Sequence, residues 1–260
     1  MTVEYQAFTL LSNYSTNAEI KSFVDKYDFY IFPVVNPDGF VYSQTSDRMW
    51  RKNRQSTSGS TCVGRDINRN WPIQWSSSGG ASTNPCAQDF KGSAQSDAPE
   101  TTALSNFLKT TKANQGLKLF IDWHSYSQLF MYRMFPPIPP SSNSTPTTNP
   151  PLLANHTAYG YSCTATTPKA NEYESLAAGT VAAIRAVYGT RFNYGPICST
   201  IYKTTGSSVD WTQDVAGADY SFTFELRDTG SYGFVLPANQ IVPSGNEMWP
   251  AVRYLLQNMR

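Results

Sequence analysis

The stretch Leu117-Lys118-Leu119-Phe120-Ile121-Asp122-Trp123 decides the fold class, and His124 follows it directly. Its short apolar and aromatic run predicts a buried strand. One helix is predicted before it, beginning near Asp97, and an alanine-rich helix after it, from Asn171 to Tyr188. A second strand is predicted from Tyr220 to Leu226. Strands that alternate with helices indicate an α/β domain with a mixed, largely parallel central sheet flanked by helices.

Other parts of the chain give further signals for local structure. Apolar residues at helical spacing predict a helix from Val3 to Leu11, and the aromatic and β-branched run from Asp28 to Val35 predicts a buried strand. Asn36-Pro37-Asp38-Gly39 predicts a turn, and the polar region from Gln55 to Ala98 predicts long loops. Ser244 and Glu247 have the spacing of a capping box ahead of a last helix.

Composition excludes several classes of protein. The 260 residues are 40% hydrophobic and 15% charged, which is enough for one core in a single domain and unlike a disordered chain. The net charge of +1 gives no electrostatic surface for nucleic acid or an anionic membrane. The longest apolar runs, such as Phe29 to Val35, are too short to span a bilayer.

The cysteines and sequons favour an oxidising compartment. Cys62, Cys86, Cys163 and Cys198 form an even set without a Cys-x-x-Cys pair, so they make two disulfides or remain four buried thiols. Sequons for N-glycosylation begin at three asparagines, Asn13, Asn143 and Asn155. The chain begins without the basic and apolar blocks of a signal peptide, so we expect the beginning of a secreted protein to be missing.

Three groups of residues could carry chemistry. His124 follows a strand, where open α/β sheets bind ligands, but it is also explained as a histidine satisfied by backbone hydrogen bonds. His156 belongs to a sequon and is interpreted as a surface residue. Glu225 lies among core residues, so it either pairs with Arg227 or acts as a general base.

The third group is a compact loop of guanidinium and amide side chains. Arg51, Arg54 and the run Asn68-Arg69-Asn70 suit recognition of a carboxylate, which arginine binds in a bidentate way. Arg48 and Lys52 are interpreted as a solvated face. Signatures of serine hydrolases, phosphate-binding loops and dinucleotide sites are absent from the sequence.

Taken together, these segments resemble the zinc metallocarboxypeptidases of the carboxypeptidase A and B type, in the family's order and spacing over essentially the whole chain. The matching segments are Asn36 to Phe40, Arg48 to Arg54, Cys62 to Trp71, His124 to Gln128, Tyr202 and Phe222 to Asp228.

The resemblance implies a role for each matching residue. His124 would be the third zinc ligand, Glu225 the general base that activates water, and Arg51 the group that stabilises the oxyanion. Three residues would bind the substrate's free C-terminal carboxylate: Asn68, Arg69 and Tyr202. Tyr126 and Phe234 would line the substrate cleft. Val209 would form the floor of the terminal side-chain pocket, and Asp66 would orient a zinc-binding histidine.

The resemblance also implies partners and cross-links. The partners would be peptide and protein C-termini, bound by a secreted monomer that uses one zinc ion, with neither nucleic acid nor membrane involved. An apolar residue at Val209 would favour hydrophobic or aromatic C-terminal residues. The implied disulfides are Cys62–Cys86 and Cys163–Cys198. A proline-rich surface insertion at about 136–151 has no counterpart in the family pattern.

One departure from the family is serious, because no His-x-x-Glu motif, which supplies the first two zinc ligands, occurs in the chain. We therefore expect an N-terminally incomplete catalytic domain over 1–260 that binds zinc poorly, is inactive by itself, and tends to aggregate. Its sheet should lack a strand between about Asp28–Val34 and Tyr220–Leu226. The alternatives are a non-catalytic module that binds peptide C-termini and a remnant without function.

Overall fold

The computed structural model describes residues 1–133 and 169–260. Sequence signals that lie outside these residues are the insertion at 136–151, His156, Cys163 and the sequons at Asn143 and Asn155. The helices, 3-10 turns and strands occur in the order α1 (Thr2–Asn13), α2 (Ala18–Lys26), α3 (Pro37–Thr45), η1 (Ile67–Arg69), α4 (Pro99–Gln115), β1 (Leu119–His124), β2 (Leu129–Tyr132), α5 (Ala170–Tyr188), β3 (Asn193–Pro196), α6 (Ile197–Thr200), α7 (Ser208–Asp214), β4 (Tyr220–Glu225), η2 (Gly233–Val235), η3 (Ala238–Gln240) and α8 (Ile241–Asn258).

The strands of the described residues form one mixed sheet in the order β1-β4-β2-β3. β1 runs parallel to β4, β2 runs antiparallel to β4, and β2 runs parallel to β3. Two of these three pairings are parallel, so the predicted mixed α/β class is confirmed. β4 lies in the interior of the sheet and β1 at its edge.

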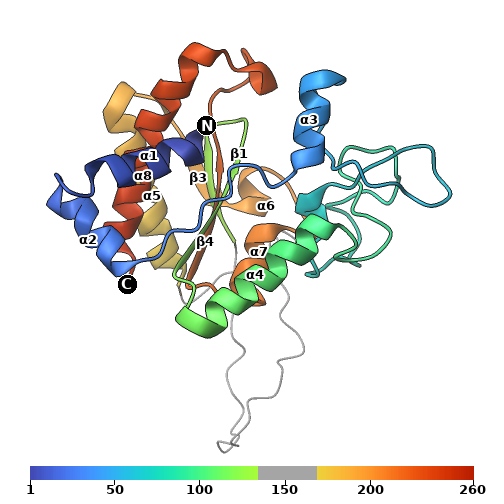
Figure 1. The fold of residues 1–260 in the computed structure, drawn as a ribbon, viewed down its shortest axis with the longest axis horizontal. Helices are drawn as coiled ribbons and strands as arrows, with labels where there is room; N and C mark the ends of the chain where they lie inside the picture. The colour runs from blue at the N-terminus through green and yellow to red at the C-terminus, as the bar shows by residue number, and fades with distance from the viewer. Residues whose placement is uncertain (134–168) are drawn as a thin grey trace, which may run out of the picture.

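Helices cover both faces of the sheet (Figure 1). On one face, α5 and α8 pack against an aromatic row in which Phe130, Phe222 and Phe224 are all fully buried. On the other face, α4 and α7 enclose a smaller cluster around Trp71 and Trp211, whose ring centroids are 5.0 Å apart. The core therefore lies in two layers, one on each side of β4.

The helix ends follow the sequence signals in most places. α4 begins with Pro99, which needs no backbone N–H in the first turn. α5 ends at Gly189, which has a φ of 78° in the left-handed region that glycine adopts at low cost. The predicted helix near the N-terminus is α1, and the predicted strands at 117–123 and 220–226 are β1 and β4.

Three predictions of local structure are wrong. Residues 28–35 form no strand. Asn36 does not begin an isolated turn; its side chain accepts a hydrogen bond from the Gly39 N–H and caps α3. The last helix begins at Ile241, so Ser244 and Glu247 lie inside it, where Glu247 is fully buried.

The sequence predicts a gap in the sheet beside the strand at 220–226, but the structure has an open edge at β1. β4 is paired on both sides, so it does not face a gap. Among the described residues, β1 and β3 are the two edge strands, each with a partner on one side only. The unpaired edge of β1 and residues 28–35 line one cavity of about 1220 Å³.

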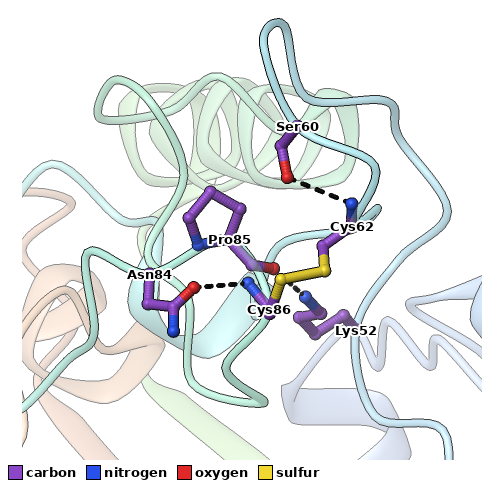
Figure 2. The surroundings of a disulfide bond; sticks show 6 residues. All are labelled: Lys52, Ser60, Cys62, Asn84, Pro85 and Cys86. Atoms are coloured by element: carbon purple, nitrogen blue, oxygen red, sulfur yellow. Dashed lines mark hydrogen bonds between the residues drawn. A yellow bond between two sulfur atoms is a disulfide. The ribbon is translucent and has the colours of Figure 1, made fainter.

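The long loops between α3 and α4 are fastened by the Cys62–Cys86 disulfide, which confirms this predicted pairing (Figure 2). Around it, the Ser60 hydroxyl accepts from Cys62 N–H and the Asn84 side chain accepts from Cys86 N–H, each at 3.0 Å. The buried Lys52 donates to the Pro85 carbonyl at 2.6 Å. Lys52 is therefore not a solvated surface residue, as its place in the sequence suggested.

Candidate active site

His124 and Glu225 lie side by side at the carboxyl ends of two parallel strands. They are direct partners in the register of β1 and β4. Carboxyl ends of parallel strands are where open α/β sheets present ligand-binding side chains. The structure therefore brings together the predicted metal ligand and the predicted base, which are separated by about a hundred residues of sequence.

The imidazole of His124 is held by side chains rather than by backbone groups. Its Nε2 lies 3.0 Å from Asp122 Oδ2 and 3.1 Å from Asn68 Nδ2. Ser208 donates its hydroxyl hydrogen to the same Asp122 carboxylate. Burial alone would lower the pKa of His124, but the charge of Asp122 outweighs it, so this pKa is raised. The interpretation of His124 as a backbone-satisfied residue is thus wrong.

Asp66 forms the centre of a buried cluster of charges. Its Oδ2 accepts from Nε of Arg51 at 2.8 Å, and Nη2 of the same arginine also lies at 2.8 Å. Arg69 Nη1 is 4.0 Å away, and Oδ1 accepts from the Asn68 N–H at the start of η1. Burial favours the neutral acid, but the charges of Arg51 and Arg69 outweigh it, and the pKa of Asp66 is lowered.

The three residues predicted to bind a carboxylate form one group, called here the clamp (Asn68, Arg69 and Tyr202). Arg69 is only 4% exposed and donates from Nη1 to the Asn68 carbonyl at 2.7 Å. Its Nη2 lies 3.5 Å from the Tyr202 hydroxyl, and Tyr202 is 52% exposed. Ser208 N–H donates to Asn68 Oδ1 at 2.9 Å. The clamp thus joins a fixed guanidinium to a phenol that solvent can reach.

Glu225 does not pair with Arg227. The Arg227 guanidinium instead donates from Nε to Glu247 Oε2 at 2.6 Å and also binds Oε1 of that carboxylate. Burial raises the pKa of Glu225, and the nearby charges of His124 and Arg51 offset part of the rise. A carboxylate with a raised pKa suits proton transfer near neutral pH.

The remaining predicted site residues lie in two separate places. The rings of Tyr126 and Phe234 meet edge to face with centroids 4.8 Å apart, which brings the two predicted cleft residues together. Val209, on α7, is 1% exposed and packs with Leu129, Met131 and Ile197. Its surroundings are therefore apolar. Arg54 lies apart from the clamp, with its guanidinium 3.7 Å from the Tyr42 ring centroid.

The donor set does not fit a complete zinc site. In residues 1–133 and 169–260, no three His, Cys, Asp or Glu side chains converge so that they could hold a metal ion. His124 is the one imidazole in this part of the chain, and its Nε2 is already in contact with Asp122 and Asn68. A catalytic zinc needs three protein ligands with an open position.

Sequence reasoning missed Asp122 and Ser208. Asp122 precedes His124 by two residues, so both side chains lie on one face of β1, and this spacing could have indicated the contact. The contact between Ser208 and Asp122 joins residues 86 positions apart. No local pattern reports such a pairing.

In the described ranges, no helix is both long and apolar enough to cross a membrane.

A family model described as zinc carboxypeptidase matches residues 1–251. Metallocarboxypeptidase A of Arthroderma otae is 46% identical over 247 residues, which cover 95% of this chain and 52% of the relative. Mouse carboxypeptidase A2 is 40% identical over 259 residues, which cover 55% of that protein. The chain thus spans about half the length of the curated relatives that it matches.

Solved structures agree with these relatives. The structure of bovine thrombin-activatable fibrinolysis inhibitor in complex with tick carboxypeptidase inhibitor has a TM-score of 0.83 and 32% identity, and the match covers 99% of this chain and 76% of that one. Carboxypeptidase A from Helicoverpa armigera has a TM-score of 0.77 at 22% identity, which supports the fold alone. The chain belongs to the zinc carboxypeptidase family.

Proposed function

We propose that this chain contributes the C-terminal carboxylate site and the general-base side of a metallocarboxypeptidase active site. The enzyme would remove hydrophobic or aromatic C-terminal residues from peptides and proteins. The observation that carries the proposal is the clamp, in which buried Arg69 is fixed by the Asn68 carbonyl beside the half-exposed Tyr202. A guanidinium held in this way can bind a carboxylate through two parallel hydrogen bonds with little loss of side-chain entropy.

Two charged groups support a hydrolytic role beside the clamp. Glu225, with its raised pKa, would take a proton from the attacking water. Arg51 would place positive charge where the scissile carbonyl oxygen becomes negative, provided that it turns away from Asp66. The family's zinc would supply Lewis acidity to this reaction, but the described residues do not provide the three ligands that it needs.

For residues 1–260 alone, the observations favour a second function, the non-catalytic binding of peptide C-termini. His124 is engaged by Asp122 and by Asn68, and Asn68 belongs to the clamp. Asn68 and Arg69 of the clamp thus make these side-chain contacts without a metal. We also propose that the protein is secreted and monomeric. The Cys62–Cys86 disulfide supports secretion, because disulfides form in oxidising compartments.

The test is binding of a fluorescent hexapeptide that ends in phenylalanine, measured by anisotropy in the presence of EDTA. The free acid should bind at least tenfold more tightly than the C-terminal amide, since only the acid offers two oxygens to Arg69. Mass spectrometry of the same mixture should detect no release of phenylalanine. Equal affinity for acid and amide would refute recognition of C-termini. Release of phenylalanine in EDTA would refute the non-catalytic assignment.

A further inference from the structure

A short loop of serine and glycine residues lies against the segment that carries Tyr202, and we call it the support loop (residues 76–80). Lys203, the next residue after Tyr202, donates from Nζ to the Ser78 carbonyl of this loop at 2.9 Å. We propose that the support loop holds the Tyr202 phenol in the clamp, and that Lys203 is a positioning residue that ties the two together. The inference rests on the proposed function, because it concerns how the clamp binds a C-terminal carboxylate.

The contacts between Tyr202 and Arg69 are long. The Tyr202 hydroxyl lies 3.5 Å from Arg69 Nη2, and the guanidinium carbon lies 6.0 Å from the centroid of the phenol ring. Both distances are at the outer limit for a hydrogen bond and for a cation–π contact. Tyr202 is 52% exposed, whereas Thr204 and Thr205 on the same segment are 6% and 1% exposed. The buried backbone that follows Tyr202 therefore decides where the phenol lies.

The support loop touches that buried backbone directly. Gly80 has a φ of 82°, and a Cβ atom placed on it would lie 2.8 Å from the Thr204 carbonyl carbon and 2.9 Å from the Thr205 backbone nitrogen. The Thr205 hydroxyl also donates to the Gly79 carbonyl at 3.4 Å. Since glycine is the one residue without a Cβ atom, it alone allows this approach at this φ. The support loop thus forms one wall of the segment that carries Tyr202.

Lys203 extends the contact to the outer part of the loop. Its Nζ lies 3.7 Å from a Cβ atom placed on Gly79, so the ammonium lies against the loop backbone while it donates to the Ser78 carbonyl. A charged donor makes a stronger hydrogen bond than a neutral one. Because Lys203 adjoins Tyr202, this bond restrains the peptide unit that carries the phenol. Lys203 therefore acts on the clamp through Tyr202 and is not itself a ligand of the carboxylate.

The support loop is anchored at its base by a buried lysine. Lys91 is 8% exposed and donates from Nζ to the Trp75 carbonyl at 2.7 Å, and Trp75 Nε1 donates to the Lys91 carbonyl at 2.9 Å. The Lys91 N–H donates to the Ser82 carbonyl at 3.1 Å, within the segment that the Cys62–Cys86 disulfide closes. The disulfide thus contributes to the clamp, because it fastens the loops on which the support loop rests.

The tie affects binding because a phenol that is held in advance loses less conformational freedom when a carboxylate binds. Without the hydrogen bond of Lys203, Tyr202 would sample more positions, and the affinity for a C-terminal carboxylate would fall. Arg69 would stay in place, since it donates to the Asn68 carbonyl at 2.7 Å. The expected loss of affinity is therefore partial, about three- to tenfold, and smaller than the loss expected for Arg69→Gln.

The experiment measures the affinity of residues 1–260 for the hexapeptide that ends in phenylalanine, as free acid and as C-terminal amide, by anisotropy in EDTA. Lys203→Met removes the ammonium group but keeps an unbranched stem. It should weaken binding of the acid about three- to tenfold and leave binding of the amide unchanged. Lys203→Arg can still donate to the Ser78 carbonyl, so it should bind the acid within about twofold of the wild type.

Further variants separate positioning from a general structural role. In a Tyr202→Phe background, Lys203→Met should cause no further loss, because the hydroxyl that Lys203 positions is absent. Gly80→Ala should weaken binding of the acid as Lys203→Met does, since its Cβ would displace the backbone at Thr204. Gly59→Ala is the control, because Gly59 has a φ of 75° and no atom within 4 Å of the added Cβ, so the affinity should not change.

Unchanged affinity for the acid in Lys203→Met overturns the proposal, and so does an equal loss of affinity for acid and amide. A further loss in the Tyr202→Phe background also overturns it, because Lys203 would then act independently of Tyr202. These outcomes leave the recognition of C-termini intact as long as the wild type prefers the acid. A wild type that binds acid and amide equally would refute both the recognition of C-termini and this inference.

Discussion

At the scale of single residues, Asp66 controls the charge of the site. Burial alone would raise the pKa of Asp66 above its ordinary value of 3.8, but Arg51 and Arg69 outweigh burial and hold this pKa lower. The ionised carboxylate therefore stabilises the folded state at pH values above the ordinary pKa, and this stabilisation is lost as the pH falls through the lowered pKa.

Asp66→Asn should accordingly reduce the free energy of unfolding at pH 7, by roughly 1.5–3 kcal/mol for a lost hydrogen bond to a charged group. The difference from the wild type should shrink as the pH falls below about 3.8. Urea unfolding at a series of pH values measures this directly, with Asp89→Asn as an exposed carboxylate control. A difference that is constant with pH would show that Asp66 stabilises the fold without its charge.

Val209 carries the prediction of side-chain preference. It is 1% exposed and packs with the apolar side chains of Leu129, Met131 and Ile197, which cannot pair with a buried ammonium or guanidinium group. Peptides that end in phenylalanine or leucine should bind more tightly than peptides that end in lysine or arginine, by at least tenfold. A competition assay with free-acid peptides that differ only in the last residue tests this. Equal or tighter binding of the lysine peptide would contradict the assignment of Val209 to the pocket floor.

At the scale of elements, the clamp depends on how closely two loops approach each other. Gly206 has a φ of 65°, and a Cβ atom placed on it would lie 2.2 Å from the Arg69 carbonyl oxygen. Gly206→Ala should therefore displace Arg69 and weaken binding of a C-terminal carboxylate at least fivefold.

Gly59→Ala is the matched control, because Gly59 has a similar φ of 75° but no atom within 4 Å of its added Cβ. It should cost about 1–2 kcal/mol of backbone strain and leave the affinity unchanged. If both variants changed affinity equally, backbone strain rather than the contact with Arg69 would explain the effect.

Local patterns predicted the elements whose stability is local and missed those that depend on a partner. Pro99 and Gly189 marked the ends of α4 and α5 because the backbone conformation at a helix end is decided by the residue itself. Residues 28–35 have the composition of a strand, yet a strand also requires hydrogen-bonding partners, and these residues have none among the described residues. Glu247 has capping-box spacing, but its pairing with Arg227 holds it inside α8.

In the candidate site, likewise, the residues were predicted from sequence motifs, but some of their contacts were not. Motif resemblance named His124, Glu225 and the clamp, and the sheet register and hydrogen bonds bring these residues together. The contacts of Arg51 with Asp66 and of His124 with Asp122 were not predicted. They depend on which neighbouring groups compete for each charge, and that is decided by the packed structure.

At the scale of the whole molecule, residues 1–260 should bind zinc weakly. His124 supplies one imidazole, and in the described part of the chain no three donor side chains converge on a common point. Isothermal titration with zinc should therefore give no stoichiometric binding tighter than the micromolar range, and added zinc should not produce peptidase activity. Tight one-to-one binding with turnover would mean that other residues complete the site.

The central claim is that Arg69, held by Asn68 beside Tyr202, recognises a free C-terminal carboxylate. The most direct test measures the affinities of one peptide as free acid and as amide, for the wild type and for Arg69→Gln, with Arg185→Gln on the exposed surface of α5 as the control. The wild type and the control should prefer the acid at least tenfold, and Arg69→Gln should bind acid and amide equally. A preference for the acid that survives in Arg69→Gln would contradict the account.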